Sequence, residues 1–206
     1  MEKLKALHSL YYFIKEDIAK KLEEFKSIGK DEGKVFKELI FCILTPQSKA
    51  EICWNAVERM FKKNIVPEGS VDEIARELKG VRFRFNKARY IVEARKFFNK
   101  NFLRKLNDMD AVNAREWLVK NIKGYGYKEA SHFLRNIGKG FELAILDRHI
   151  LKNLVEFSVI DNIPALTKKK YYEIEKKMRE FSERIGIPMA YLDFVLWHRQ
   201  TGRIFK

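Results

Sequence analysis

The fold is decided at Lys123-Gly124-Tyr125-Gly126-Tyr127-Lys128-Glu129-Ala130, where two glycines flank a single tyrosine. Glycine adopts the positive φ angles that a tight turn needs, and Ala130 is small enough to let two helices approach closely. Apolar residues continue at helical spacing on both sides of the turn, over Trp117 to Ile122 and over Tyr127 to Ile137. The pattern therefore predicts two helices joined by a very short turn, a helix–hairpin–helix.

The same turn is suited to bind an anion. Backbone N–H groups at a helix start have no partner within the helix, and the helix dipole favours negative charge there. We expect Gly124, Tyr125 and Gly126 to contact a nucleic-acid phosphate through such groups. A contact of this kind positions DNA without reading its sequence. The alternative is that the turn is an ordinary connection between two helices.

The composition indicates a phosphate-rich partner. Among 206 residues there are 42 Lys and Arg against 28 Asp and Glu, a formal net charge of +14 at pH 7. A basic surface gains free energy from counterion release on nucleic acid. The alternative is a charged surface of the kind found in thermophilic proteins. No secretory segment and no apolar run of ~20 residues is present, so we expect an intracellular protein, in the cytoplasm or nucleoid, without a membrane partner.

Most other segments also have helical periodicity. The N-terminal stripe, with spacings of three and four, consists of Leu4, Leu7, Tyr11, Ile14, Ile18, Leu22 and Phe25. Because no useful alternating pattern and no internal repeat occur, the predicted fold class is all-α. Ser48 with Glu51, and Ser70 with Glu73, have the form of capping boxes and predict helices that start after each serine.

Lys128 and Asp147 are the candidate catalytic residues. Lys128 lies in the first turn of the second hairpin helix, where the positive end of the dipole disfavours a further positive charge. A neutral amine there is a nucleophile that can form a Schiff base with a sugar carbon. Asp147 fits the N-cap position of the next helix, and its carboxylate can stabilise positive charge developing on a deoxyribose ring. The alternatives are a lysine that only contacts phosphate and an aspartate that only caps a helix.

These residues together resemble the helix–hairpin–helix DNA glycosylases, a superfamily named for this hairpin. Lys128 and Asp147 match the nucleophilic lysine and the assisting aspartate of its bifunctional members. The segment Asp147-Arg148-His149 resembles their Asp-x-His, and Phe41 to Gln47 resembles the early helix and polar turn that probe the DNA strand. The resemblance therefore implies that His149 and Gln47 contact the DNA backbone.

The chain is more similar still to the short archaeal-type 8-oxoguanine DNA glycosylases. This likeness covers most of its length, notably Gly124 to Asn136, Asp147 to Leu151 and Trp197 to Lys206. The chain differs from the endonuclease III and adenine-glycosylase branches, because it has only Cys42 and Cys53, which we expect in the core, and so lacks the cysteines of their iron–sulfur cluster. It also has Lys123 where many members have a proline before the first glycine.

The resemblance implies two helical domains with an active-site cleft between them. Residues 31–142 would form the domain with the hairpin, and residues 1–30 plus 143–206 would form the second domain. A flipped base would stack on Phe83 and Trp197, with Phe85 as a rival for the first position, and Lys206 at the C-terminus would reach that base. Basic residues around Phe83 are typical of base stacking and phosphate contact, whereas Trp197 fits a helix core equally well.

The predicted function is that of a bifunctional DNA glycosylase/AP lyase. It would flip 8-oxoguanine out of double-stranded DNA and excise it, acting as a monomer without a metal or organic cofactor. Two alternatives stay open: a glycosylase for another oxidised base, and a non-catalytic helix–hairpin–helix DNA-binding module.

Overall fold

The computed structural model describes residues 2–97 and 100–206, and helices are its regular secondary structure. In chain order the elements are α1 (Glu2–Ile28), α2 (Glu32–Leu44), α3 (Ala50–Lys62), α4 (Val71–Glu77), α5 (Arg84–Ala94), the 3₁₀ turn η1 (Arg95–Phe97), α6 (Lys100–Asn107), α7 (Ala111–Asn121), α8 (Tyr127–Asn136), α9 (Arg148–Glu156), α10 (Lys168–Ile185) and α11 (Met189–Thr201). The predicted all-α class is confirmed. No helix in this part of the chain is long and apolar enough to cross a membrane.

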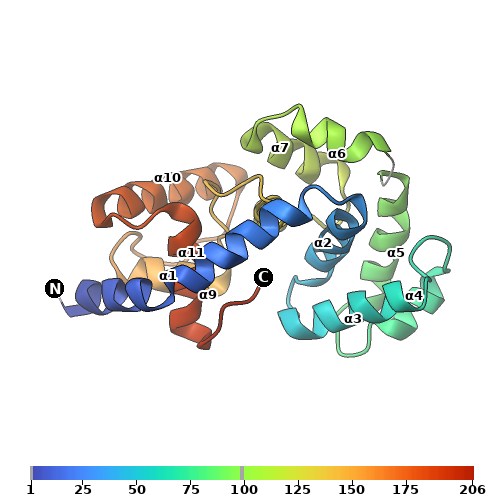
Figure 1. Ribbon diagram of the computed structural model, residues 1–206, viewed down its shortest axis with the longest axis horizontal. Helices are drawn as coiled ribbons and strands as arrows, with labels where there is room; N and C mark the ends of the chain where they lie inside the picture. Colours follow the sequence, from blue (N-terminus) through green and yellow to red (C-terminus); the bar gives the residue numbers. More distant parts are fainter. Residues whose placement is uncertain (1, 98–99) are drawn as a thin grey trace.

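The helices form two groups. Helices α2 to α7 lie on one side of the molecule and α9 to α11 on the other, while α1 runs from the second group toward α2 (Figure 1). The second hairpin helix, α8, packs against α1, α2 and α7, and α1 also packs against α11. This arrangement confirms a two-domain all-α fold with the hairpin in one domain. The boundaries at residues 30 and 142 stay a prediction.

The apolar stripes fix which face of each helix is buried. On α1 the buried residues are Leu7, Ile14, Ile18, Leu22, Phe25 and Ile28, whereas Leu4 is exposed and Tyr11 is only half-buried. Helix α2 is buried over most of its length, at Val35, Phe36 and Glu38 to Leu44, as its apolar run Leu39 to Leu44 requires. It contacts α3, α5, α6 and α8, so it forms the centre of its group.

One of the two predicted capping boxes is confirmed and the other is wrong. Ser70 Oγ accepts from the N–H of Glu73, and Glu73 Oε2 accepts from the N–H of Ser70. By contrast, α3 begins at Ala50, after Lys49, without a side-chain cap. Ser48 Oγ instead accepts from the N–H of Arg82 at 3.0 Å, a tertiary partner far along the chain. The hydroxyl of Ser48, which the local pattern predicts to cap a helix, therefore makes a tertiary contact instead.

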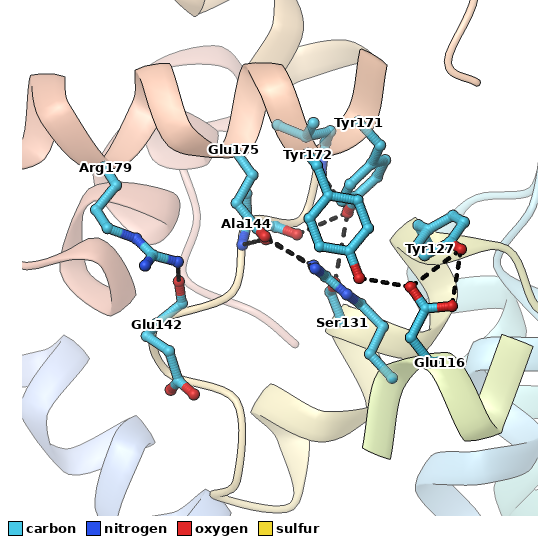
Figure 2. A network of polar contacts seen from close by, with 11 residues as sticks. Glu116, Tyr127, Ser131, Glu142, Ala144, Tyr171, Tyr172, Glu175 and Arg179 are labelled. Carbon is cyan, nitrogen blue, oxygen red and sulfur yellow. Dashed lines mark hydrogen bonds and ion pairs between the residues drawn. The ribbon is translucent and has the colours of Figure 1, made fainter. Parts of the chain in front are cut away.

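A buried polar network joins the two helix groups (Figure 2). Arg115 on α7 is fully buried and forms a bidentate ion pair with Glu175 on α10, with N–O distances of 2.6 and 2.9 Å. The same carboxylate accepts from the N–H of Ala144 at 2.8 Å, while Tyr171 donates to the carbonyl of Ala144 at 2.7 Å. The segment that leads to α9 is thus held by α7 and α10 together.

The second part of this network fixes the start of α8. Glu116 on α7 accepts from the hydroxyl of Tyr127 at 3.0 Å and from that of Tyr172 at 2.5 Å (Figure 2). Tyr127 is the first residue of α8 and directly precedes Lys128. The carboxylate therefore links α7, α8 and α10 at the point where the candidate nucleophile begins.

Replacing Arg115 with methionine should strongly destabilise the protein, because Glu175 then becomes a buried carboxylate without its counter-ion. Breaking a buried ion pair from one side costs about 3–5 kcal/mol. The measurement is the free energy of unfolding in urea, followed by circular dichroism.

The matched control is Lys176→Met on the same helix as Glu175. Lys176 pairs with Glu180 at 3.9 Å, and the two side chains are 80% and 60% exposed. Such exposed pairs contribute little to stability. An Arg115→Met variant as stable as Lys176→Met would contradict the role given to the buried pair.

Candidate active site

A cleft of about 1020 Å³ lies between the two helix groups. Its wall is built from the turn before α3, from α8, from the segment that enters α9, and from α11 with the C-terminal tail. The fold brings six of the predicted site residues to this wall: Gln47, Lys128, Asp147, His149, Trp197 and Lys206. Residues from the two predicted domains therefore meet in a single cavity.

The hairpin turn requires glycine at Gly124 for two reasons. Its φ is +90°, and a Cβ at this position would lie 2.6 Å from the ring of Tyr90. Tyr125 is buried, and its hydroxyl donates to the carbonyl of Leu39 at 2.9 Å. The side chain of Tyr125 therefore belongs to the core.

The expectation that the turn offers free N–H groups is wrong for two of its three residues. The N–H of Tyr125 donates to the carbonyl of Ile122 at 3.1 Å, and that of Gly126 donates to Glu129 Oε2, also at 3.1 Å. Both acceptors belong to the hairpin itself: one is a backbone carbonyl and the other is a side-chain carboxylate. A phosphate contact by Gly124, Tyr125 and Gly126 stays a prediction.

Lys128 lies in the first turn of α8 and has a carboxylate partner. Its Nζ is 2.8 Å from Glu129 Oε1, and its side chain is 22% exposed. The other oxygen of Glu129 holds the N–H of Gly126, so one buried carboxylate caps the helix and pairs with the lysine. This charge offsets the helix dipole, on which the expectation of a neutral amine rested. The carboxylate is also placed to accept the proton that the lysine must lose to become a nucleophile.

Asp147 is the N-cap of α9, as predicted. Its Oδ1 accepts from the N–H of Ile150 at 2.8 Å. The same residue lines the cleft together with Lys128, so capping and a role in the site are compatible.

His149 lies two residues after Asp147 and also lines the cleft. Its Nδ1 is buried without a hydrogen-bond partner in the described part of the chain.

Two non-glycine residues near the cleft have left-handed backbone. The φ angles are +54° at Gln47 and +57° at Phe83, a conformation that non-glycine residues adopt at a cost. Gln47 is exposed and lines the cleft, whereas the Phe83 ring is 54% exposed and does not line it. Phe85 is also exposed outside the lining. The structure thus brings Trp197 to the cleft but not Phe83, whose stacking role stays a prediction.

Lys87 holds the turn of Gln47 from inside the protein. Its buried ammonium donates to the carbonyls of Leu44 and Pro46, both at 2.7 Å, and to Ser48 Oγ at 3.1 Å. This role was not expected from the sequence, because Lys87 follows a basic stretch of a kind that is usually solvent-exposed. One pattern in the sequence did indicate burial: Lys87 lies one helical turn before Ile91, so the two side chains share the face of α5 that points to the core. Burial lowers the pKa of Lys87 to about 8.

Buried charges in and behind the cleft wall were also missed. Glu38 on α2 pairs with Lys206, and Arg135 on α8 pairs with Asp193 on α11. Burial raises the pKa of Asp193 to about 6. The sequence did indicate that Glu38 and Asp193 are buried, since each interrupts an otherwise apolar stretch of helix. Nothing near them in the sequence showed which lysine or arginine would pair with each.

The cysteines are core residues, as predicted. Cys42 and Cys53 are both fully buried, and burial raises the pKa of the Cys53 thiol to about 11. Thiols in this state are poor nucleophiles. Within the described ranges, no three His, Cys, Asp or Glu side chains are grouped as metal ligands.

Comparison with known proteins gives concordant matches. Residues 18–187 match the family described as 8-oxoguanine DNA glycosylase. The 8-oxoguanine DNA glycosylase/AP lyase of Fusobacterium nucleatum is 44% identical, over 97% of this chain and 96% of its own length. The 8-oxoguanine glycosylase/lyase of Methanocaldococcus jannaschii, solved with a 15mer DNA containing 8-oxoguanine, has a TM-score of 0.91 at 40% identity, and 100% of each chain is covered. The Thermotoga maritima 8-oxoguanine DNA glycosylase has a TM-score of 0.90 at 37% identity, covering 100% of this chain and 99% of its own.

Replacing Lys87 with methionine should lower stability by about 1–3 kcal/mol at neutral pH, because three acceptors lose their donor. The loss should grow as the pH rises. The folded protein gives up the Lys87 proton near pH 8 and the unfolded chain only near 10.5, so raising the pH through this window favours the folded wild type. Urea unfolding of both proteins at several pH values measures the difference. A difference that shrinks between pH 8 and 10.5 would contradict the assignment.

Proposed function

Because the chain belongs to the 8-oxoguanine DNA glycosylase family, we propose that it is a bifunctional DNA glycosylase/AP lyase that excises 8-oxoguanine from double-stranded DNA. The observation that supports this function best is that Lys128 and Asp147 line the same cleft between the two domains. A nucleophilic amine and a carboxylate facing one cavity are what Schiff-base chemistry at a sugar requires.

The proposed chemistry begins at the sugar of the extruded nucleotide. Lys128 Nζ attacks C1′ as the bond from C1′ to the base breaks, after Glu129 has accepted the proton of the ammonium. Asp147 stabilises the oxocarbenium-like charge that develops on the ring. The departing base takes up the proton that the attached amine loses. The C1′–O4′ bond of the sugar then breaks, O4′ is protonated, and the open-chain sugar is held as a protonated Schiff base. Loss of a C2′ proton from this Schiff base expels the 3′ phosphate by β-elimination, which cleaves the strand.

The damaged base is proposed to bind near Trp197 and Lys206. Both residues line the cleft, and Arg82 lines it as well. Phe83 directly follows Arg82, and its side chain is exposed. An indole face suits an extruded purine, because stacking on aromatic rings stabilises an unpaired base. Phe83 would complete this pocket once DNA is bound.

The DNA backbone is proposed to contact Gln47, His149 and the hairpin residues Gly124, Tyr125 and Gly126. The net charge of +14 and the position of Gln47 and His149 in the cleft wall support such contacts. Tyr125 would contribute only by sharing its backbone N–H between the phosphate and Ile122, since its side chain is buried. The protein would act as a monomer inside the cell, in the cytoplasm or nucleoid where its DNA substrate is found.

Borohydride reduction should trap the wild-type protein covalently on a duplex that contains 8-oxoguanine. The Schiff base is reduced to a stable amine, which gel electrophoresis detects as a protein–DNA adduct. Lys128→Gln should give no adduct, because it lacks the amine. The same assay on duplexes with oxidised pyrimidines or undamaged guanine tests the choice of base.

Two results would contradict the proposed reaction. An adduct formed by Lys128→Gln would show that another amine is the nucleophile. Absence of any wild-type adduct across the lesions, with DNA binding retained, would favour a non-catalytic DNA-binding module.

Replacing Asp147 with asparagine should slow base excision by about 100-fold or more, because it removes a charge that stabilises the transition state. Asparagine is as good an N-cap as aspartate, so the stability of α9 should be preserved. Single-turnover excision kinetics and thermal unfolding measure the two effects. If Asp147→Asn loses thermal stability in proportion to its loss of excision rate, the role of Asp147 is only that of a helix cap.

A further inference from the structure

The C-terminal tail crosses from one helix group to the other. Helix α11 ends at Thr201, and Gly202 turns the chain away with a φ of +70°. The C-terminus then lies between α11 and α2 (Figure 1). The ring of Phe205 meets that of Phe41 on α2 edge-on, with the centroids 6.4 Å apart. A chain terminus is usually frayed, so these contacts show a tail that is held in place.

Lys206 is held by two partners in the opposite domain. Its Nζ forms an ion pair with Glu38 on α2 and lies 3.6 Å from the ring centroid of Trp54 on α3. The side chain of Lys206 is only 9% exposed. Cation–π and ionic contacts both strengthen when water is excluded. The last residue of the chain is therefore part of the cleft wall.

Glu38 lies behind this wall and depends on Lys206. The carboxylate is 1% exposed and does not line the cleft. Its second oxygen accepts from Asn136 Nδ2 at 2.8 Å, which leaves Lys206 as the positive charge paired with it. Burial of an unpaired carboxylate is costly, so each member of the pair requires the other.

The contact continues toward the catalytic residues. Asn136 Oδ1 accepts from Arg135 Nε at 3.2 Å and from Nη2 at 3.1 Å, and Arg135 Nη1 pairs with Asp193. Arg135 and Asp193 line the cleft that holds Asp147. Polar contacts thus run from the C-terminal residue through the buried Glu38 and Asn136 to Arg135 and Asp193 in the cleft wall.

We propose that Glu38 is a positioning residue for base recognition, which acts by holding Lys206 in the wall of the cleft. It does not contact the DNA, and it takes no part in the chemistry at the sugar. This inference rests on the proposed function. Its consequence is a separation of the two activities, because excision requires recognition of the base, whereas strand cleavage at a pre-formed abasic site requires Lys128 but no base.

The test is Glu38→Gln, which keeps the size of the side chain and removes its charge. Single-turnover excision of 8-oxoguanine should fall by about 10-fold or more, the loss typical when one member of a buried charge pair is removed. Cleavage of a duplex with a pre-formed abasic site should stay within about 2-fold of wild type, as expected where no contact is lost. The abasic-site assay also reports the concentration of folded, active protein in the same sample.

The control is Glu58→Gln, which removes the partner of Lys37, the residue before Glu38, in an ion pair between α2 and α3. Glu58 is half-exposed and lies outside the cleft lining, so both activities should be unchanged. Glu38→Gln combined with Lys206→Met should excise no more slowly than the slower single variant, because both changes remove one contact.

Three outcomes would overturn the proposal: unchanged excision by Glu38→Gln, an equal loss of both activities, or a double variant whose loss is the product of the single losses. A wild-type protein inactive on both duplexes would instead overturn the proposed function, and with it this role of Glu38. The activity of the wild-type protein on the two duplexes therefore distinguishes failure of the proposed function from failure of the role proposed for Glu38.

Discussion

The architecture depends on charges that are buried where the two helix groups meet. Three ion pairs each join a residue of the predicted hairpin domain to a residue of the second domain: Arg115 with Glu175, Arg135 with Asp193, and Glu38 with Lys206. A buried charge without its partner costs several kcal/mol, so these pairs are stable only while the groups stay docked. The cleft lies between the same groups, and the pairs therefore fix its geometry.

The position of Lys128 follows from two further carboxylates. Glu116 holds the first residue of α8 through the hydroxyl of Tyr127, and Glu129 holds both the N–H of Gly126 and the ammonium of Lys128. Neither contact involves the substrate. The helix start is thus held by protein groups alone, and a nucleophile positioned in advance loses less entropy on reaching the transition state.

Local patterns predicted the elements and several site residues correctly. The all-α class, the cap at Asp147 and the placement of Lys128 at a helix start follow from spacing that acts over three or four residues. The cap predicted at Ser48 was wrong because Arg82 and Lys87 take its hydroxyl. The expectation of free N–H groups at Tyr125 and Gly126 was wrong for a local reason, since Ile122 and Glu129 within the hairpin accept from them. The donors that Ser48 meets, by contrast, are decided by the fold.

The sequence by itself determined the helices, the hairpin and the chemical identity of the candidate catalytic pair, because these depend on neighbours along one turn or one helix. Only the tertiary structure decided which buried charges pair, since Glu38 and Lys206 are 168 residues apart. It also decided that the Phe83 ring lies outside the cleft lining while the C-terminal lysine lies within it. The physical reason is that burial makes a charge depend on a partner, and the partner is chosen by how the helices dock.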